Sequence, residues 1–188
     1  MALFPSMLLA DIGQALNGKS IRLESVSTSI EEKKPLGDAY GGLGCKFNQP
    51  NSYAIQTDDT GDWYSVMIDR EELKKKAEGL FSNAGLDITY KRASNPFANE
   101  NPAIVITADI SDLSLYTCGA MFGGKASGNM SMVVIWRVFD VEAEELIGQL
   151  ETNATDESKK KIRGIISWMV EEAFMTSSEQ FLAKSGEE

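Results

Sequence analysis

The feature that most constrains the fold is a pair of long segments with the two-residue alternation of a β-strand. The second of them, residues 129–140, reads NMSMVVIWRVFD. Both faces of this strand would be largely apolar, which is typical of an inner strand of a sheet. One face carries Met130, Met132, Val134, Trp136 and Val138, and the other carries Val133, Ile135, Arg137 and Phe139. We expect Arg137 near a sheet margin, where its guanidinium reaches water or a carboxylate while its stem covers apolar surface.

The first segment, residues 102–118, reads PAIVITADISDLSLYTC and is the longest strand candidate. Up to Ile110 the apolar residues occupy every second position, and after Ile110 this alternation is displaced by one residue. A β-bulge near Ser111–Asp112 would keep the apolar side chains on the same face of the strand. A glycine-rich connection, 119–128, then joins the two segments. We therefore predict that they pair as antiparallel neighbours.

Two helices are expected. The first spans 69–84, where Asp69 is placed to cap the N-terminus and Gly85 to end the helix in a left-handed conformation. The second spans 157–182, begins after acidic residues, and carries an apolar stripe with Ile166 near its middle. Replacing Ile166 by Ala is expected to cost about 2 to 5 kcal/mol.

Shorter strands are expected at 20–27, 51–57, 86–90 and 146–153, the second of them inside a long connection over 28–62. The order of elements predicts an α+β fold, with a largely antiparallel or mixed sheet and two main helices packed on one face.

We predict a single α+β domain over residues 20–182, preceded by an N-terminal segment, 1–19, and followed by a C-terminal tail, 183–188. In the first segment Leu8, Leu9, Ile12 and Leu16 recur at helical spacing. This favours a short amphipathic helix packed on the domain, with a truncated secretion signal or a partner-binding helix as alternatives. As written, the segment is neither a secretion signal nor a membrane span, because it lacks a basic start and Asp11 ends its apolar run.

The composition excludes several classes of function. Eighteen basic against 28 acidic residues give a net charge of −10, the wrong sign for a nucleic-acid surface. The chain has no histidine, which excludes serine triads, Cys-His dyads and His-ligated zinc. The acidic turn TDDTGD, 57–62, lacks the spacing of a calcium loop. We expect no catalytic residues, no metal and no cofactor, and no small-molecule substrate is evident.

The two cysteines, Cys45 and Cys118, lie 73 residues apart, and each stands beside a glycine. That spacing fits no metal motif. They could form one disulfide in an oxidising compartment or remain two buried thiols in the cytosol. Neither the disulfide nor the pair of thiols predicts a catalytic nucleophile, because no imidazole is present to activate a thiol.

Several short segments are informative together with the order of elements. They are SIRLESVS, the pair Leu36-Gly37, the helix end LFSNAGLDI, the strand VITADISDL, and WRVFD followed by LIGQLETNA. In these segments and in the order of elements, residues 20–182 resemble the YajG-type lipoproteins and the wider group of ABC-transport auxiliary lipoproteins of Gram-negative envelopes.

The resemblance implies a non-catalytic binding or assembly module in a larger periplasmic or outer-membrane-associated complex. The family's mature chain begins with an acylated cysteine, whereas no cysteine precedes Cys45 here. Membrane association would therefore need an anchor absent from this chain, and the location would be cytoplasmic if the chain is complete as written. The alternatives are a cytosolic interaction domain, or a small-ligand binder or enzyme with an acidic pocket.

Two loops, 36–47 and 119–128, are the expected surface for a protein partner or for self-association. Both combine glycines with apolar side chains that no periodicity assigns to the core, and such side chains are enriched at interfaces. The alternative is that they fold back and plug the ends of the domain. The candidate residues are Tyr40, Leu43, Phe47, Met121 and Phe122.

Overall fold

The structure is a computed structural model, which describes residues 9–32, 34–41, 51–55, 65–89, 102–119, 126–162 and 164–186. Its helices are α1 (Leu9–Leu16), α2 (Arg70–Asn83) and α3 (Ile165–Ser185). Its strands are β1 (Ser20–Thr28), β2 (Gly37–Gly41), β3 (Asn51–Ile55), β4 (Ser65–Val66), β5 (Asp87–Ile88), β6 (Ile104–Gly119), β7 (Ala126–Asp140) and β8 (Glu145–Ile162).

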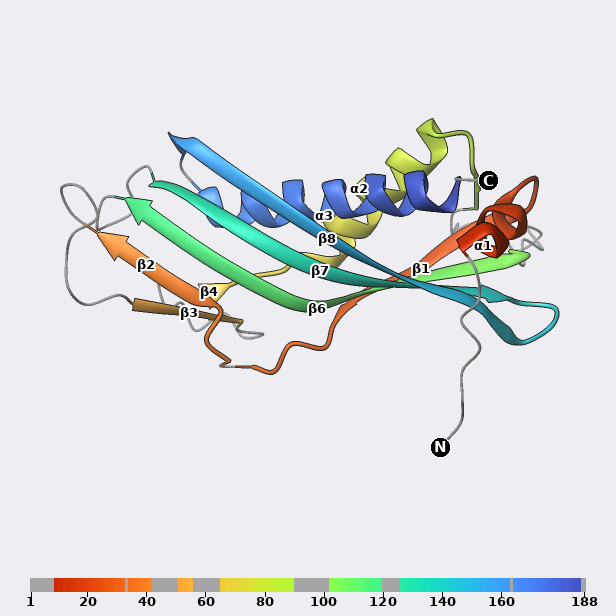
Figure 1. Cartoon of the computed structure of the whole chain (residues 1–188), viewed down its shortest axis with the longest axis horizontal. Coiled ribbons are helices and arrows are strands. Elements are labelled where there is room, and N and C mark those ends of the chain that lie inside the picture. Colours follow the sequence, from red (N-terminus) through yellow and green to blue (C-terminus); the bar gives the residue numbers. More distant parts are fainter. Residues whose placement is uncertain are drawn as a thin grey trace, which may run out of the picture.

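The sheet is organised around β6, whose two edges are both paired (Figure 1). On one edge β6 pairs antiparallel with β7, which pairs antiparallel with β8. On the other edge β1 runs parallel to the first half of β6, and β2 runs parallel to the second half. β5 adds to β1, while β3 and β4 add to β2. The predicted inner position of β7 and the bulge between Ile110 and Asp112 are both confirmed.

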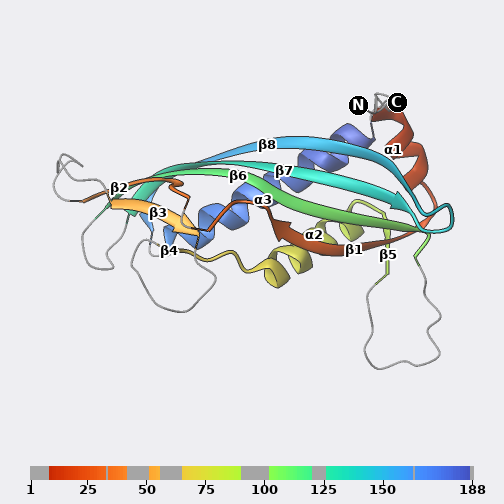
Figure 2. The same ribbon diagram turned by 90° about the horizontal axis from the view of Figure 1, so that it is seen from below.

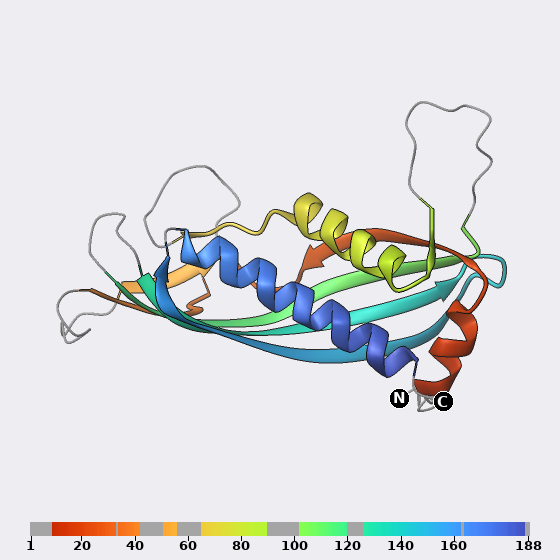
Figure 3. The same ribbon diagram turned by 90° about the horizontal axis from the view of Figure 1, so that it is seen from above.

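Both main helices lie on one face of this mixed sheet, which confirms the predicted α+β class (Figure 3). Figure 2, the opposite view, shows β6, β7 and β8 in front of α3. Four fully buried aromatic rings pack between the layers, and Trp136 stacks on Phe181 with ring centroids 4.9 Å apart. The others are Phe81, 5.9 Å from Trp136, and Phe174, 5.7 Å from it. One continuous core therefore joins β7 to both helices.

Helix α2 has the predicted ends. The side chain of Asp69 accepts a hydrogen bond from the backbone N–H of Glu72 at 3.0 Å, which satisfies one free donor of the first turn. Gly85 follows the helix with φ of +91°, a conformation that favours glycine. Polar residues occupy most of the outer face, and Leu73, Ala77 and Phe81 face the core.

The predicted start of the last helix is wrong. Residues 157–162 continue β8, and α3 begins only at Ile165 after Gly164, whose φ is +64°. Thr155 pairs with Ser131 and Glu157 with Asn129, so backbone pairing to β7 overrides the local capping signal. Ile166, at the centre of the predicted stripe, is only partly buried. The expected cost of Ile166→Ala is therefore lower, at about 1 to 2 kcal/mol.

The connection expected over 28–62 contains β2 as well as the predicted β3. Leu36 is buried, and a Cβ on Gly37 would lie 1.8 Å from the carbonyl oxygen of Leu115. The backbones of β2 and β6 thus approach so closely that only glycine fits. Within the described part of the predicted strand 86–90, residues 86–89, only the two residues of β5 are strand.

The amphipathic helix expected near the N-terminus is present as α1, with Ile12 and Leu16 buried. It packs on β8 and on α3, so residues 9–16 lie beside the last turn of α3 (Figure 3). Residues 183–185, placed in the predicted tail, form the last turn of α3. The division into one domain with two terminal segments stays a prediction.

Candidate interaction surfaces

The face of the sheet opposite the helices is called the open face here. Its central part carries the half-buried apolar side chains Val105, Val133, Ile135 and Phe139. Arg137 lies among them and donates from Nε to Oε1 of Gln149 on β8 at 3.1 Å. Arg137 reaches solvent, as one of the two expected alternatives required, because no described helix covers this face. Its hydrogen-bond partner is the amide of Gln149 and not a carboxylate.

β2 pairs with the second half of β6 at the end of the sheet distant from α1 (Figure 1). On the open face there, two tyrosines from these strands meet. Tyr40 on β2 and Tyr116 on β6 have ring centroids 5.2 Å apart and ring planes inclined by 38°. Tyr116 keeps 39% of its surface exposed. Such tilted pairs are favoured by the quadrupoles of the rings.

Polar side chains flank this pair. Asp38 is the register partner of Tyr116 across β2 and β6, and Asn129 is its partner across β6 and β7. The hydroxyl of Tyr40 lies 3.5 Å from Oδ2 of Asp38, to which it donates. We call this group the tyrosine platform: Asp38, Tyr40, Ser114, Tyr116, Asn129 and Ser131, the last four of them exposed.

The pKa of Tyr40 is raised, first by desolvation and then by the nearby charge of Asp38. The neutral phenol is therefore favoured even more strongly than in a free tyrosine. At neutral pH the platform presents a protonated hydroxyl beside a carboxylate, a combination that can both donate and accept hydrogen bonds.

Of the residues predicted for partner binding, the structure describes Tyr40 alone. Leu43, Phe47, Met121 and Phe122 lie outside the described residues. Sequence reasoning missed Tyr116, although the outward positions of the strand after the bulge would have indicated it. Residues 37–41, expected in a loop, form β2.

Cys118 lies at this same end of the sheet, half-buried and in register with Tyr40. Cys45 lies outside the described residues, four positions after the end of β2. A chain of four residues spans at most about 14 Å. The predicted pairing of Cys45 with Cys118 is compatible with that reach, and it stays a prediction.

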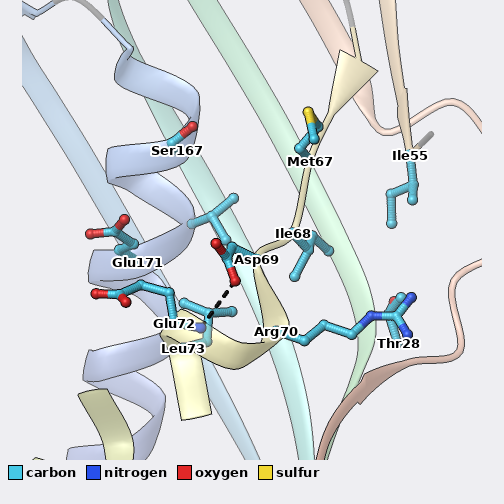
Figure 4. A pocket seen from close by; sticks show the side chains of 11 residues that line it. Thr28, Ile55, Met67, Ile68, Asp69, Arg70, Glu72, Leu73, Ser167 and Glu171 are labelled. Atoms are coloured by element: carbon cyan, nitrogen blue, oxygen red, sulfur yellow. Dashed lines mark hydrogen bonds between the residues drawn. The ribbon is translucent and has the colours of Figure 1, made fainter. Parts of the chain in front are cut away.

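A pocket of about 540 Å³ opens between the first turns of α2 and α3 and the ends of β1, β3 and β4 (Figure 4). Sequence reasoning did not indicate it, because its walls come from four distant stretches of the chain. Its apolar lining consists of Ile55, Met67, Ile68, Leu73 and Val170, and its polar lining of Thr28, Asp69, Arg70, Glu72, Ser167 and Glu171.

One lysine joins the two helices beside this pocket. Nζ of Lys76 on α2 forms a hydrogen-bonded ion pair with Glu171 on α3 and lies 3.9 Å from a carboxylate oxygen of Glu72. The pKa of Lys76 is raised, chiefly by its hydrogen bond to Glu171. Lys76, Glu72 and Glu171 together carry a net charge of −1.

The outer edge of β8 is partly covered by α3. β7 is the partner of β8 in the described sheet, which leaves the other edge of β8 with unpaired backbone groups. The carbonyl oxygen of Asn153 accepts from Nε2 of Gln180 at 2.9 Å, and that of Glu151 accepts from Nζ of Lys184 at 3.3 Å. These two side chains occupy acceptors that an added strand would use.

Within the described ranges, no group of three or more His, Cys, Asp or Glu side chains is arranged to hold a metal ion. None of the three described helices is both long and apolar enough to cross a bilayer.

No protein-family model matches the chain, and no curated protein matches it. Among solved structures, a Xanthomonas campestris protein of the DUF330 family has a TM-score of 0.48 at 8% identity, over 87% of this chain and 81% of that one. A Chlamydia trachomatis protein described as hypothetical has a TM-score of 0.46 at 12% identity, over 89% and 96%. The C-terminal domain of LpoB from Salmonella enterica has a TM-score of 0.34 at 10% identity, over 79% and 94%. These similarities are too weak to place the chain in a family.

Proposed function

We propose that the protein is a non-catalytic binding or assembly module of the bacterial envelope, acting in a larger periplasmic or outer-membrane-associated complex. It engages a protein partner, or a second copy of itself, through the tyrosine platform. The envelope assignment rests on the resemblance of residues 20–182 to the YajG-type and ABC-transport auxiliary lipoproteins.

The observation that carries the proposal is the contact between Tyr40 and Tyr116, at an end of the sheet where Tyr116 is exposed and no described helix covers the open face. Tyrosine is enriched in the centres of interfaces because it offers a large, rigid contact area with a polar tip. Exposed serine and asparagine side chains beside it supply adaptable hydrogen bonds. By sequence, Leu43, Phe47, Met121 and Phe122 are further proposed partner-binding residues.

The non-catalytic part of the proposal rests on the absence of histidine from the chain. The tyrosine platform has one carboxylate, and the pKa of the Tyr40 hydroxyl is raised above its ordinary value. Such a set binds and orients a partner more readily than it transfers protons at neutral pH.

The test is a double variant, Tyr40→Ser with Tyr116→Ser, compared with Leu146→Ser. Leu146 is 38% exposed and lies beside the turn between β7 and β8, at the other end of the sheet. We expect the double variant to lose self-association in sedimentation velocity, or to lose an identified partner in pull-downs from an envelope extract. Its unfolding midpoint should stay near that of the wild type.

The control variant Leu146→Ser should keep its associations. Association that survives in the double variant, together with a marked fall in stability, would contradict the proposal. That result would mean that the tyrosines support the end of the domain instead of contacting a partner.

The pocket between α2 and α3 favours a second candidate function, a small-ligand binder, because its volume of about 540 Å³ lies in the usual range for ligand sites.

A further inference from the structure

The floor of the pocket between α2 and α3 is apolar. Ile55, Leu73 and Val170 line it, and at 3% exposure or less their side chains belong to the core. Met67 stands beside them with 61% of its surface exposed. Methionine adapts its shape to apolar ligands of different form. An apolar group that enters the pocket can therefore contact these core side chains on one side and the adaptable side chain of Met67 on another.

The charges of the pocket lie on opposite sides (Figure 4). Arg70 extends from the first turn of α2 toward Thr28 on β1, whereas Glu72 and Glu171 lie on the side of α3. In the described part of the chain, Arg70 makes no side-chain hydrogen bond or ion pair. An unengaged guanidinium offers a fork of donors that matches a carboxylate.

The opposite side is acidic. Glu72 and Glu171 share the single ammonium of Lys76, so one of their two negative charges remains uncompensated. Each carboxylate also has lone pairs beyond those that Lys76 uses. This side can accept hydrogen bonds from a second cationic group.

A ligand with a single charge is attracted by one side of the pocket and repelled by the other. An anion paired with Arg70 is also repelled by the carboxylates of Asp69, Glu72 and Glu171, and nothing on the anion offsets that repulsion. A cation at the acidic side would be repelled by Arg70. A ligand that carries both charges, separated by apolar groups, meets a complementary group at each end.

We propose that this pocket binds a short apolar peptide with free termini. The peptide carboxylate pairs with Arg70, the amino group lies at Glu72 and Glu171, and the apolar side chains cover Ile55, Leu73 and Val170. This site is separate from the tyrosine platform. The proposal rests on the second candidate function, the small-ligand binder, and names its ligand, whereas its test does not depend on the tyrosine platform.

The test uses trileucine, N-acetyl-trileucine and trileucine amide, with binding measured by calorimetry and by the rise in melting temperature of the full chain. We expect trileucine to bind and each blocked form to bind about tenfold more weakly, since each loses one charge-assisted interaction. Arg70→Gln should weaken the binding of trileucine by a similar factor but leave the affinity for trileucine amide unchanged. Glu171→Gln should weaken the binding of trileucine to the same degree, but it should leave the affinity for N-acetyl-trileucine unchanged.

Arg137→Gln and Glu142→Gln are the matched controls, because they change the same charges away from the pocket. Both should bind trileucine like the wild type. Arg70 is exposed and unengaged, so Arg70→Gln is expected to fold normally, which circular dichroism checks.

Three results would overturn the proposal. The first is no binding of trileucine at millimolar concentration. The second is equal weakening by the control variants, which would indicate general attraction to a chain of charge −10. The third is tighter binding of dodecanoate than of trileucine in a manner that depends on Arg70, which would identify a fatty acid as the ligand.

Discussion

The indole N–H of Trp136 on β7 donates to the hydroxyl of Ser177 on α3 at 3.2 Å and to that of Thr152 on β8 at 3.0 Å. The two hydroxyls lie 2.6 Å apart, and Thr152 also donates to the carbonyl oxygen of Val134 at 3.3 Å. All three side chains are fully buried. The network satisfies the polar atom of the largest core residue and sets the position of α3 along the sheet.

Thr152→Val is therefore expected to lower the free energy of unfolding by about 1 to 3 kcal/mol, because the Ser177 hydroxyl loses its partner and the carbonyl oxygen of Val134 loses a donor. Ser177→Ala should cost less, since Thr152 still accepts from Trp136 and still donates to Val134. Urea denaturation of both variants and of the double variant would measure the coupling. Ser178→Ala is the control, because that hydroxyl bonds to Phe174 in its own helix. A Thr152→Val midpoint equal to the wild type would show that the network adds nothing to stability.

Gly13→Ala should displace α1. A Cβ at this position would lie 2.0 Å from the carbonyl oxygen of Ser185, at the end of α3. We expect faster amide exchange across residues 9–16 with little change in the central strands. Gly79→Ala on α2 is the matched control: its Cβ would meet no atom within 4 Å, and it should stabilise the helix by about 0.5 to 1 kcal/mol. Unchanged protection of α1 in Gly13→Ala would show that the contact with α3 does not hold it.

The ionisation of Asp140 should make the free energy of unfolding depend on pH in the acidic range. Its pKa is lowered, first by the backbone N–H of Ala143 and then by Lys19, whose Nζ lies 3.1 Å away. The folded state thus favours the ionised carboxylate. The resulting stability is present above the ordinary pKa of an aspartate, about 4, and is lost as the pH falls through the lower folded value. Asp140→Asn should be less stable than the wild type near neutral pH, and urea midpoints should converge below about pH 3. A constant difference across that range would assign the loss to geometry instead of charge.

The double variant Gln180→Ala with Lys184→Ala should expose the edge of β8. Without these side chains the carbonyl oxygens of Glu151 and Asn153 become available to an added strand. We expect concentration-dependent association in sedimentation velocity with an almost unchanged unfolding midpoint. Glu179→Ala, an exposed change on the same helix, is the control. A double variant that stays at the mass of the wild type would show that the edge is protected by other means.

Cys45 and Cys118 are expected to be bonded to each other if the protein is exported. Closing a loop of that length would contribute about 4 kcal/mol on the chain-entropy model. Mass spectrometry of non-reduced protein recovered from the periplasm should show two hydrogen atoms fewer than in the reduced chain. Two free thiols in that material would refute the pairing.

The sequence by itself determined the elements whose signals are local. The alternation in residues 104–110 and 130–138 predicts β6 and β7, because a strand repeats every two residues whatever lies beside it. Asp69 and Gly85 mark the ends of α2 for the same reason, since capping needs only the neighbouring backbone. The fold class followed from the order of these elements.

Only the tertiary structure decided the features that depend on partners distant in the chain. Residues 155–162 carry a helix-start signal, yet they form strand because β7 offers a ladder of backbone hydrogen bonds along their length. β2 exists because the backbone of Gly37 can approach β6. The tyrosine platform and the pocket beside Arg70 were likewise decided by packing, which joins side chains that no local pattern relates.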